Sequence, residues 1–125
     1  MEVTAQDVTA IRAKVDALRA SGGDHDEVTL NTALSYRPGH PVGIRVRKRG
    51  RRYDITDGAT AVNLAGRPDG WLATASDTAA RTGMNVNRRG VVFVTGFEQR
   101  DLADLVMRLA ECSREVYVSL LESAD

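Results

Sequence analysis

The residues with the clearest capacity for chemistry are arginines and aspartates gathered in one short stretch. The segment from Arg37 to Tyr53 carries seven basic residues and no acid, and Asp54 and Asp57 follow it directly. A planar guanidinium donates paired hydrogen bonds to phosphate or carboxylate oxygens, so the cluster suits nucleic acid or an acidic protein. Two neighbouring carboxylates would instead suit Mg²⁺, which prefers oxygen ligands.

The basic residues fall on a predicted β-hairpin with strands near 42–48 and 51–56. Its apolar residues alternate with the basic ones, which places the basic side chains on the outer face and around the turn at Gly50. The residues expected to bind nucleic acid or an acidic partner are Arg45, Arg47, Lys48, Arg49, Arg51 and Arg52, joined by Arg88 and Arg89 if the two hairpin tips project from the same end. The alternative is a solvated face whose charges discourage edge-to-edge aggregation.

The other reactive residue types assemble no catalytic set. Asp54 and Asp57 could hold Mg²⁺, but the favoured interpretation is that Asp57 forms a turn while Asp54 offsets nearby arginines. Cys112 lies at the edge of an apolar helical stripe, where buried cysteines are ordinary and inert. His25 and His40 have no partner at metal-ligand spacing. We therefore expect neither enzymatic activity, nor a metal, nor a cofactor.

The composition is that of an ordinary globular protein. Its 17 basic and 17 acidic residues give zero formal net charge, so the chain as a whole is not a polycation drawn to nucleic acid. No apolar run reaches the ~20 residues that a membrane helix requires, and the N-terminus lacks a signal-peptide pattern. We expect one cytoplasmic domain covering residues 1–125.

The hydrophobic periodicity predicts an α+β fold. The expected elements are a helix at 4–20, a strand at 28–36, the hairpin at 42–48 and 51–56, a helix at 71–82, a second hairpin at 84–88 and 91–95, and a helix at 98–122. Residues 59–65 fit either a short strand or one helical turn. The continuous apolar run 91–94 suggests a strand covered on both faces. The order is thus αβββαββα, with one antiparallel sheet covered by helices.

The last predicted helix carries a long apolar stripe that suggests a second role. Its final turns, around Tyr117, Leu120 and Leu121, are expected to overhang the sheet and to contact a partner subunit in a homodimer. The alternative is that the whole stripe belongs to the core.

The run from Gly50 to Gly58, with Ile55-Thr56-Asp57-Gly58 at its end, resembles a family of small bacterial and phage domains of unknown function. In that family a strand ends in an Ile-Thr/Ser-Asp-Asp-Gly motif, and a second hairpin and a C-terminal helix follow, so the resemblance covers residues 42–122. The order of elements is also similar to that of class I secretion chaperones, which are small α+β homodimers that bind partner proteins.

The leading hypothesis is therefore a non-enzymatic protein-interaction module, chaperone-like or adaptor-like and homodimeric, that binds through its sheet face or its C-terminal helix. The first alternative is nucleic-acid binding by the basic hairpin 45–52. The second is an Mg²⁺-dependent hydrolase or nuclease that uses Asp54 and Asp57.

Overall fold

Three consecutive antiparallel strands begin the computed structural model, which describes residues 27–123. Strands β1 (Glu27–Arg37), β2 (His40–Arg49) and β3 (Arg52–Thr56) are joined by two tight turns. The second turn contains Gly50 at φ 63°, a backbone conformation that costs glycine little. All three strands lie where the alternation of apolar residues predicts them.

The remaining elements are two short helices, a second hairpin and a long helix. They are α2 (Thr60–Ala65), α3 (Trp71–Arg81), β4 (Asn85–Val86), β5 (Val92–Phe97), a 3₁₀ turn (Gln99–Asp101) and α4 (Leu102–Ser123). The undecided segment 59–65 is thus helical. The five strands form one antiparallel sheet in the order β1-β2-β3-β5-β4, and the predicted α+β class is confirmed.

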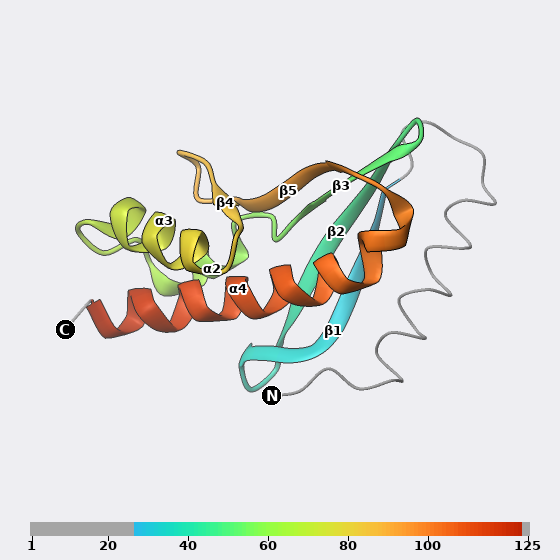
Figure 1. Cartoon of the computed structure of the whole chain (residues 1–125). Coiled ribbons are helices and arrows are strands. Elements are labelled where there is room, and N and C mark those ends of the chain that lie inside the picture. Colours follow the sequence, from blue (N-terminus) through green and yellow to red (C-terminus); the bar gives the residue numbers. More distant parts are fainter. Residues whose placement is uncertain (1–26, 124–125) are drawn as a thin grey trace.

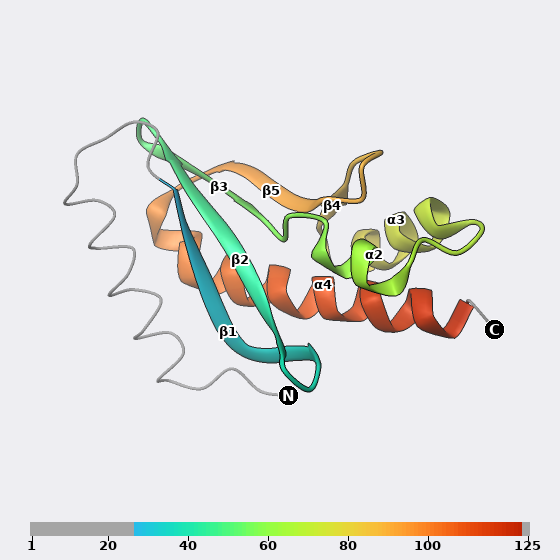
Figure 2. The same ribbon diagram turned by 180° about the vertical axis from the view of Figure 1, so that it is seen from behind.

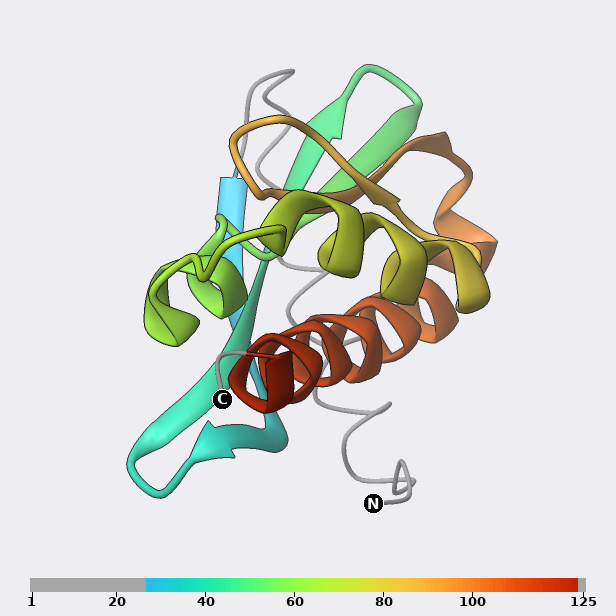
Figure 3. The same ribbon diagram turned by 90° about the vertical axis from the view of Figure 1, so that its left-hand side faces the viewer.

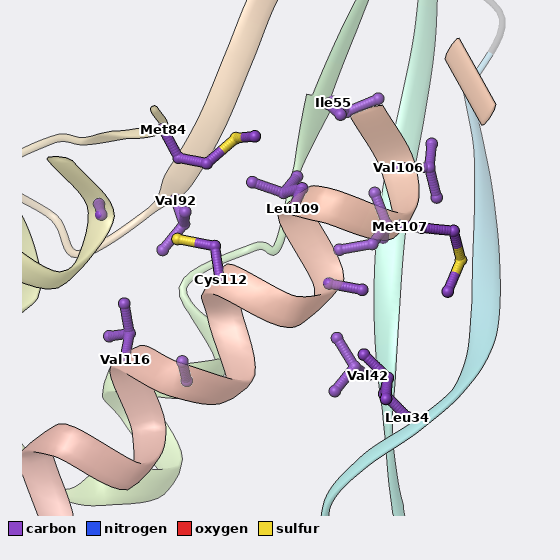
Figure 4. Close-up of a cluster of buried hydrophobic side chains, with 14 of the residues drawn as sticks. Leu34, Val42, Ile55, Met84, Val92, Val106, Met107, Leu109, Cys112 and Val116 are labelled. Atoms are coloured by element: carbon purple, nitrogen blue, oxygen red, sulfur yellow. The ribbon is translucent and has the colours of Figure 1, made fainter. Parts of the chain in front are cut away.

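Helix α4 organises the core of the molecule. Its first half lies across the sheet, and its second half runs beside α2 and α3 (Figures 1 and 3). Val106, Leu109 and Val116 on this helix are fully buried. Figure 4 shows the side chains of α4 directed toward Ile55, Val92 and other residues of the sheet. Burial of this apolar stripe is the main stabilising contribution that the helix makes, at about 25 cal/mol per Å² removed from water.

Three details differ from the sequence-based expectations. Segment 91–94 is not covered on both faces, because only Val92 in it is fully buried while the residues on either side are partly exposed. The last helix begins at Leu102 rather than 98, since Glu98 has an extended backbone and a 3₁₀ turn follows it. The two hairpin tips project from opposite ends of the sheet. β5 runs antiparallel to β3 with Phe97 opposite Tyr53, so the turn that precedes β5 lies far from the β2–β3 tip (Figure 1).

The predicted helix 4–20 lies outside the described residues. Within residues 27–123, no helix has the length and apolar character needed to span a membrane.

Candidate binding face of the sheet

The sheet has one face on which no described helix packs, and we call it the open face. Figure 2 views β1 and β2 from this side, with α4 behind them. Alternation along β2 buries Val42, Ile44 and Val46 against the helices and exposes Arg45 and Arg47 on the open face. The outward orientation predicted for these two arginines is therefore confirmed.

Strand register places two parallel rows of side chains across the open face. One row crosses all five strands and consists of Thr29, Arg45, Thr56, Phe93 and Asn85. The adjacent row runs Glu27, Arg47 and Asp54 over the first three strands. Directly opposed side chains on an antiparallel sheet are near neighbours, so Arg47 lies between two carboxylates and Arg45 between two threonines.

A hollow of about 300 Å³ lies over these rows, and we call it the sheet hollow. It combines cationic, anionic, neutral polar and apolar side chains. Its lining residues are Glu27, Arg45, Arg47, Asp54, Thr56, Asn87, Val91, Phe93 and Thr95. Such a mixture suits a ligand that has both a charged group and an apolar part.

The side chains of Arg45 and Arg47 make no hydrogen bond and no ion pair with any residue from 27 to 123. The guanidinium of Arg45 lies against Gly58. If position 58 carried a side chain, its Cβ atom would lie 3.3 Å from the Arg45 Cζ atom. Gly58 has φ 67°, and its N–H donates to Thr56 Oγ1 at 2.8 Å. The absence of a side chain at Gly58 thus gives the Arg45 guanidinium its place.

Two other basic residues of the predicted set are engaged by carboxylates of the same chain. Arg49 donates two hydrogen bonds to Asp54, at 2.9 and 3.1 Å. Hydrogen bonding from Arg49 lowers the pKa of the Asp54 carboxyl, and a bond from the Gly96 N–H contributes to the same effect. Arg52 lies 3.5 Å from Glu98. The prediction that Asp54 offsets local arginines is therefore confirmed.

The rest of the predicted basic set does not form one surface. Lys48 alternates onto the helix-bearing face of β2, and Arg51 lies exposed in the β2–β3 turn. Arg88 and Arg89 occupy the turn at the opposite end of the sheet, so they do not join the hairpin tip. That part of the predicted set is wrong because the direction of β5 fixes the second tip far from the first.

Asp54 and Asp57 lie on opposite faces of the sheet, because their spacing of three residues on a strand reverses the side-chain direction. Asp54 lines the sheet hollow, whereas Asp57 is 2% exposed beneath the sheet. The paired-carboxylate magnesium site is therefore wrong. Among the described residues, no group of three or more histidines, cysteines and acids is placed to hold a metal ion.

Asp57 is instead the centre of a buried hydrogen-bond network. Its Oδ1 atom accepts bonds from the Ala59 and Val92 N–H groups, both at 2.9 Å, and its Oδ2 atom accepts one from Ser113 Oγ at 2.6 Å. The Tyr36 hydroxyl lies 2.6 Å from Ser113 Oγ. Burial raises the pKa of Asp57, and the bonds from Ser113 and the backbone partly offset that rise.

This network connects β1, the end of β3, the start of β5 and α4. Burial also raises the pKa of the Tyr36 hydroxyl far above its usual value. The turn predicted at Asp57 is present, but its link to Ser113 and Tyr36 was missed by the sequence reasoning. The available signal was a serine at a buried position within the apolar stripe of α4.

The remaining residues considered for chemistry are separated from the open face. Cys112 is buried against the core, and burial raises the pKa of its thiol, which disfavours the reactive thiolate. His40 is exposed at the start of β2, where its Nδ1 atom lies 3.2 Å from the Pro38 carbonyl oxygen. His25 lies outside the described residues.

The predicted subunit contact on α4 is wrong for two of its three residues. Tyr117 is 4% exposed and Leu120 is fully buried, so both belong to the core of the chain itself. Tyr117 packs edge-on against Tyr36, with ring centroids 5.5 Å apart. Leu121 is exposed at 43%. The helix does not overhang the fold as expected, because α2 and α3 extend the packing surface beyond the sheet.

Comparison with known proteins finds no matching family model, no matching curated protein and no matching solved structure.

Proposed function

We propose that this protein is a non-enzymatic interaction module that binds another protein through the open face of its sheet. The observation that carries the proposal is the position of the Arg45 and Arg47 side chains, which line the sheet hollow without a hydrogen-bond or ion-pair partner in the described part of the chain. Arginines whose donors face outward beside an aromatic side chain are common anchors of protein interfaces.

The charges of the open face favour a protein over nucleic acid. Glu27 and Asp54 line the same hollow as the two arginines and would repel a phosphate backbone. Arg49 and Arg52, which were expected to add phosphate contacts, are bonded to carboxylates of their own chain. A protein partner can place single charges of either sign opposite the acids and arginines of the open face. A nucleic acid presents only negative charges and cannot match this mixed pattern.

The separation of the reactive residue types supports a non-enzymatic role. Asp54 and Asp57 lie on opposite sides of the sheet, and the Cys112 thiol is buried. The homodimer remains a prediction. Of the three residues proposed to contact a second subunit, only Leu121 is exposed. A light-scattering mass at micromolar concentration tests it directly.

The proposal is tested by comparing three tagged baits in lysate of the source cell, followed by quantitative mass spectrometry. The baits are the wild type, Arg45→Ala with Arg47→Ala, and a control that carries Arg51→Ala with Arg88→Ala. The two double variants have equal charge, and the control residues are exposed outside the sheet hollow. We expect a partner to be lost only from the first variant. Recovery of the same proteins by all three baits would refute the proposal.

A gel-shift titration of a short DNA duplex and a short RNA at two salt concentrations tests the nucleic-acid alternative. A shift that weakens steeply with salt and disappears in the Arg45→Ala, Arg47→Ala variant would establish that alternative, since phosphate contacts release counterions. We expect no specific shift.

A further inference from the structure

We propose that the sheet hollow receives a carboxylate side chain, Asp or Glu, from the protein partner, with Arg45 as its anchor. In the complex, an apolar side chain next to that carboxylate packs on Phe93. This inference rests on the proposed function and specifies the chemistry of the partner at the same face. The choice of Arg45 as the anchor rests on two differences between Arg45 and Arg47, in charge environment and in positional order.

The first difference is the charge environment of each arginine. Arg47 lies between Glu27 and Asp54 in its row, so two carboxylates of the chain are its neighbours, although neither forms an ion pair with it. Arg45 has Thr29 and Thr56 on either side, and no acid occupies its row. An incoming anion therefore gains more from Arg45, where no internal carboxylate competes for the guanidinium.

The second difference is positional order. The Arg45 guanidinium lies against the backbone of Gly58, with its Cζ, Nε and Nη2 atoms 3.3 to 3.5 Å from the place of a Gly58 Cβ atom. Contact with a turn restricts where the fork of donors can lie. An arginine restrained in this way loses less side-chain entropy when it binds a carboxylate through two hydrogen bonds.

The apolar part of the hollow lies along the same row. Phe93 is two strands from Arg45, with Thr56 between them, and it lines the hollow together with Val91. Both apolar side chains are partly exposed. Such exposed apolar surface in a concave site favours an occupant with its own apolar group. The volume of about 300 Å³ suits one or two side chains of a partner rather than a whole folded element.

The occupant is a carboxylate because of the acids in the lining. Glu27 and Asp54 flank Arg47, so a phosphate monoester, which carries nearly two charges at neutral pH, meets two negative groups on entering the hollow. A carboxylate carries a single charge and can bond Arg45 on the row that contains no acid. Planar carboxylate oxygens also match the guanidinium fork in a paired geometry.

The test uses a displayed library of random peptides selected on the immobilised full chain. We expect the selected peptides to share an Asp or Glu adjacent to an aliphatic or aromatic residue. Selected peptides are then synthesised in two forms, one with the acid and one with the corresponding amide, and their affinities are measured by fluorescence anisotropy. Binding is compared between the wild type, Arg45→Ala and the charge-matched control Arg51→Ala.

Arg45→Ala and the acid-to-amide change in the peptide should each weaken binding by roughly 10- to 100-fold, since each removes a charge-assisted pair of hydrogen bonds. Together they should weaken it no further than either alone, because both changes remove the same contact. Arg51→Ala should bind as the wild type does, and Arg47→Ala should lose less than Arg45→Ala. Arg45→Lys keeps the charge but lacks the fork, so its affinity should lie between those of the wild type and the alanine variant.

Losses that multiply in the double change, or selected peptides that contain no acid, overturn the carboxylate site. A library that yields no peptide bound to the open face overturns it as well. The bait comparison distinguishes this failure from that of the proposed function. If partners are lost from the Arg45→Ala, Arg47→Ala bait while the peptide losses multiply, protein binding at this face stands and only the carboxylate anchor fails.

Discussion

Ser113→Ala should destabilise the fold through the groups that it leaves behind. The Ser113 hydroxyl has one proton, which it donates to Asp57 Oδ2 at 2.6 Å, so it accepts the bond from the Tyr36 hydroxyl at the same distance. The alanine variant leaves the buried Tyr36 hydroxyl without a partner and removes one of the donors to Asp57. An unsatisfied buried polar group costs about 1 to 3 kcal/mol.

The net expected loss is about 2 to 4 kcal/mol, after the two deficits are added and the helix preference of alanine over serine is subtracted. Asp57 retains its bonds from the Ala59 and Val92 N–H groups, so the loss of the Ser113 bond to Asp57 should cost close to the lower limit of that 1 to 3 kcal/mol range, at about 1 kcal/mol. Tyr36→Phe alone should cost about 1 kcal/mol, because it removes a hydrogen bond without leaving a donor unpaired. The phenylalanine ring keeps the contact with Tyr117.

The decisive measurement is the double variant, Tyr36→Phe with Ser113→Ala. It contains no orphaned hydroxyl at position 36, so its loss should be no greater than that of Ser113→Ala alone, which gives a coupling free energy of about 1 to 2 kcal/mol. Urea unfolding followed by circular dichroism and by the fluorescence of Trp71, the only tryptophan, supplies the values. If the losses of the two single variants simply add, the hydroxyl relay from Tyr36 through Ser113 to Asp57 does not exist as described.

Two further predictions concern pH and backbone geometry. The folded pKa of Asp54 is lowered by Arg49, so its contribution to stability is present above the ordinary aspartate pKa of about 4 and is lost as the pH falls through the folded value. Arg49→Ala should therefore be less stable than the wild type at neutral pH, and this difference should shrink in acid urea titrations; a constant difference would contradict the linkage. Gly90→Ala should lower stability by about 2 kcal/mol or more, because its Cβ would lie 3.0 to 3.1 Å from Val62 at φ 87°. Gly66→Ala is the matched control, with the same φ and nothing within 4 Å, and an equal loss in both variants would show that backbone strain alone decides the effect.

The local periodicity of apolar residues in the sequence was sufficient to predict most of the helices and strands. Alternating apolar residues determine a strand wherever one face is buried, since every second side chain points the same way. The three-stranded unit from β1 to β3 and the outward direction of Arg45 follow from that rule. The long apolar stripe of α4 follows from the helical period in the same way. The spacing of three residues between Asp54 and Asp57 already places their side chains on opposite faces of a strand, so their separation was predictable from the sequence.

The tertiary structure alone decided which distant residues meet. The direction of β5 places Arg88 and Arg89 far from the β2–β3 hairpin tip. Leu120 is fully buried on α4, which packs along α2 and α3, so it is not available to a partner. Pairing of β3 with β5 brought Phe93 into the row of Arg45 and so created the sheet hollow. The physical reason is that side-chain direction is a local property of the backbone. The charge and apolar surface that surround a side chain, by contrast, come from strands and helices far away in the chain, and only folding brings these together.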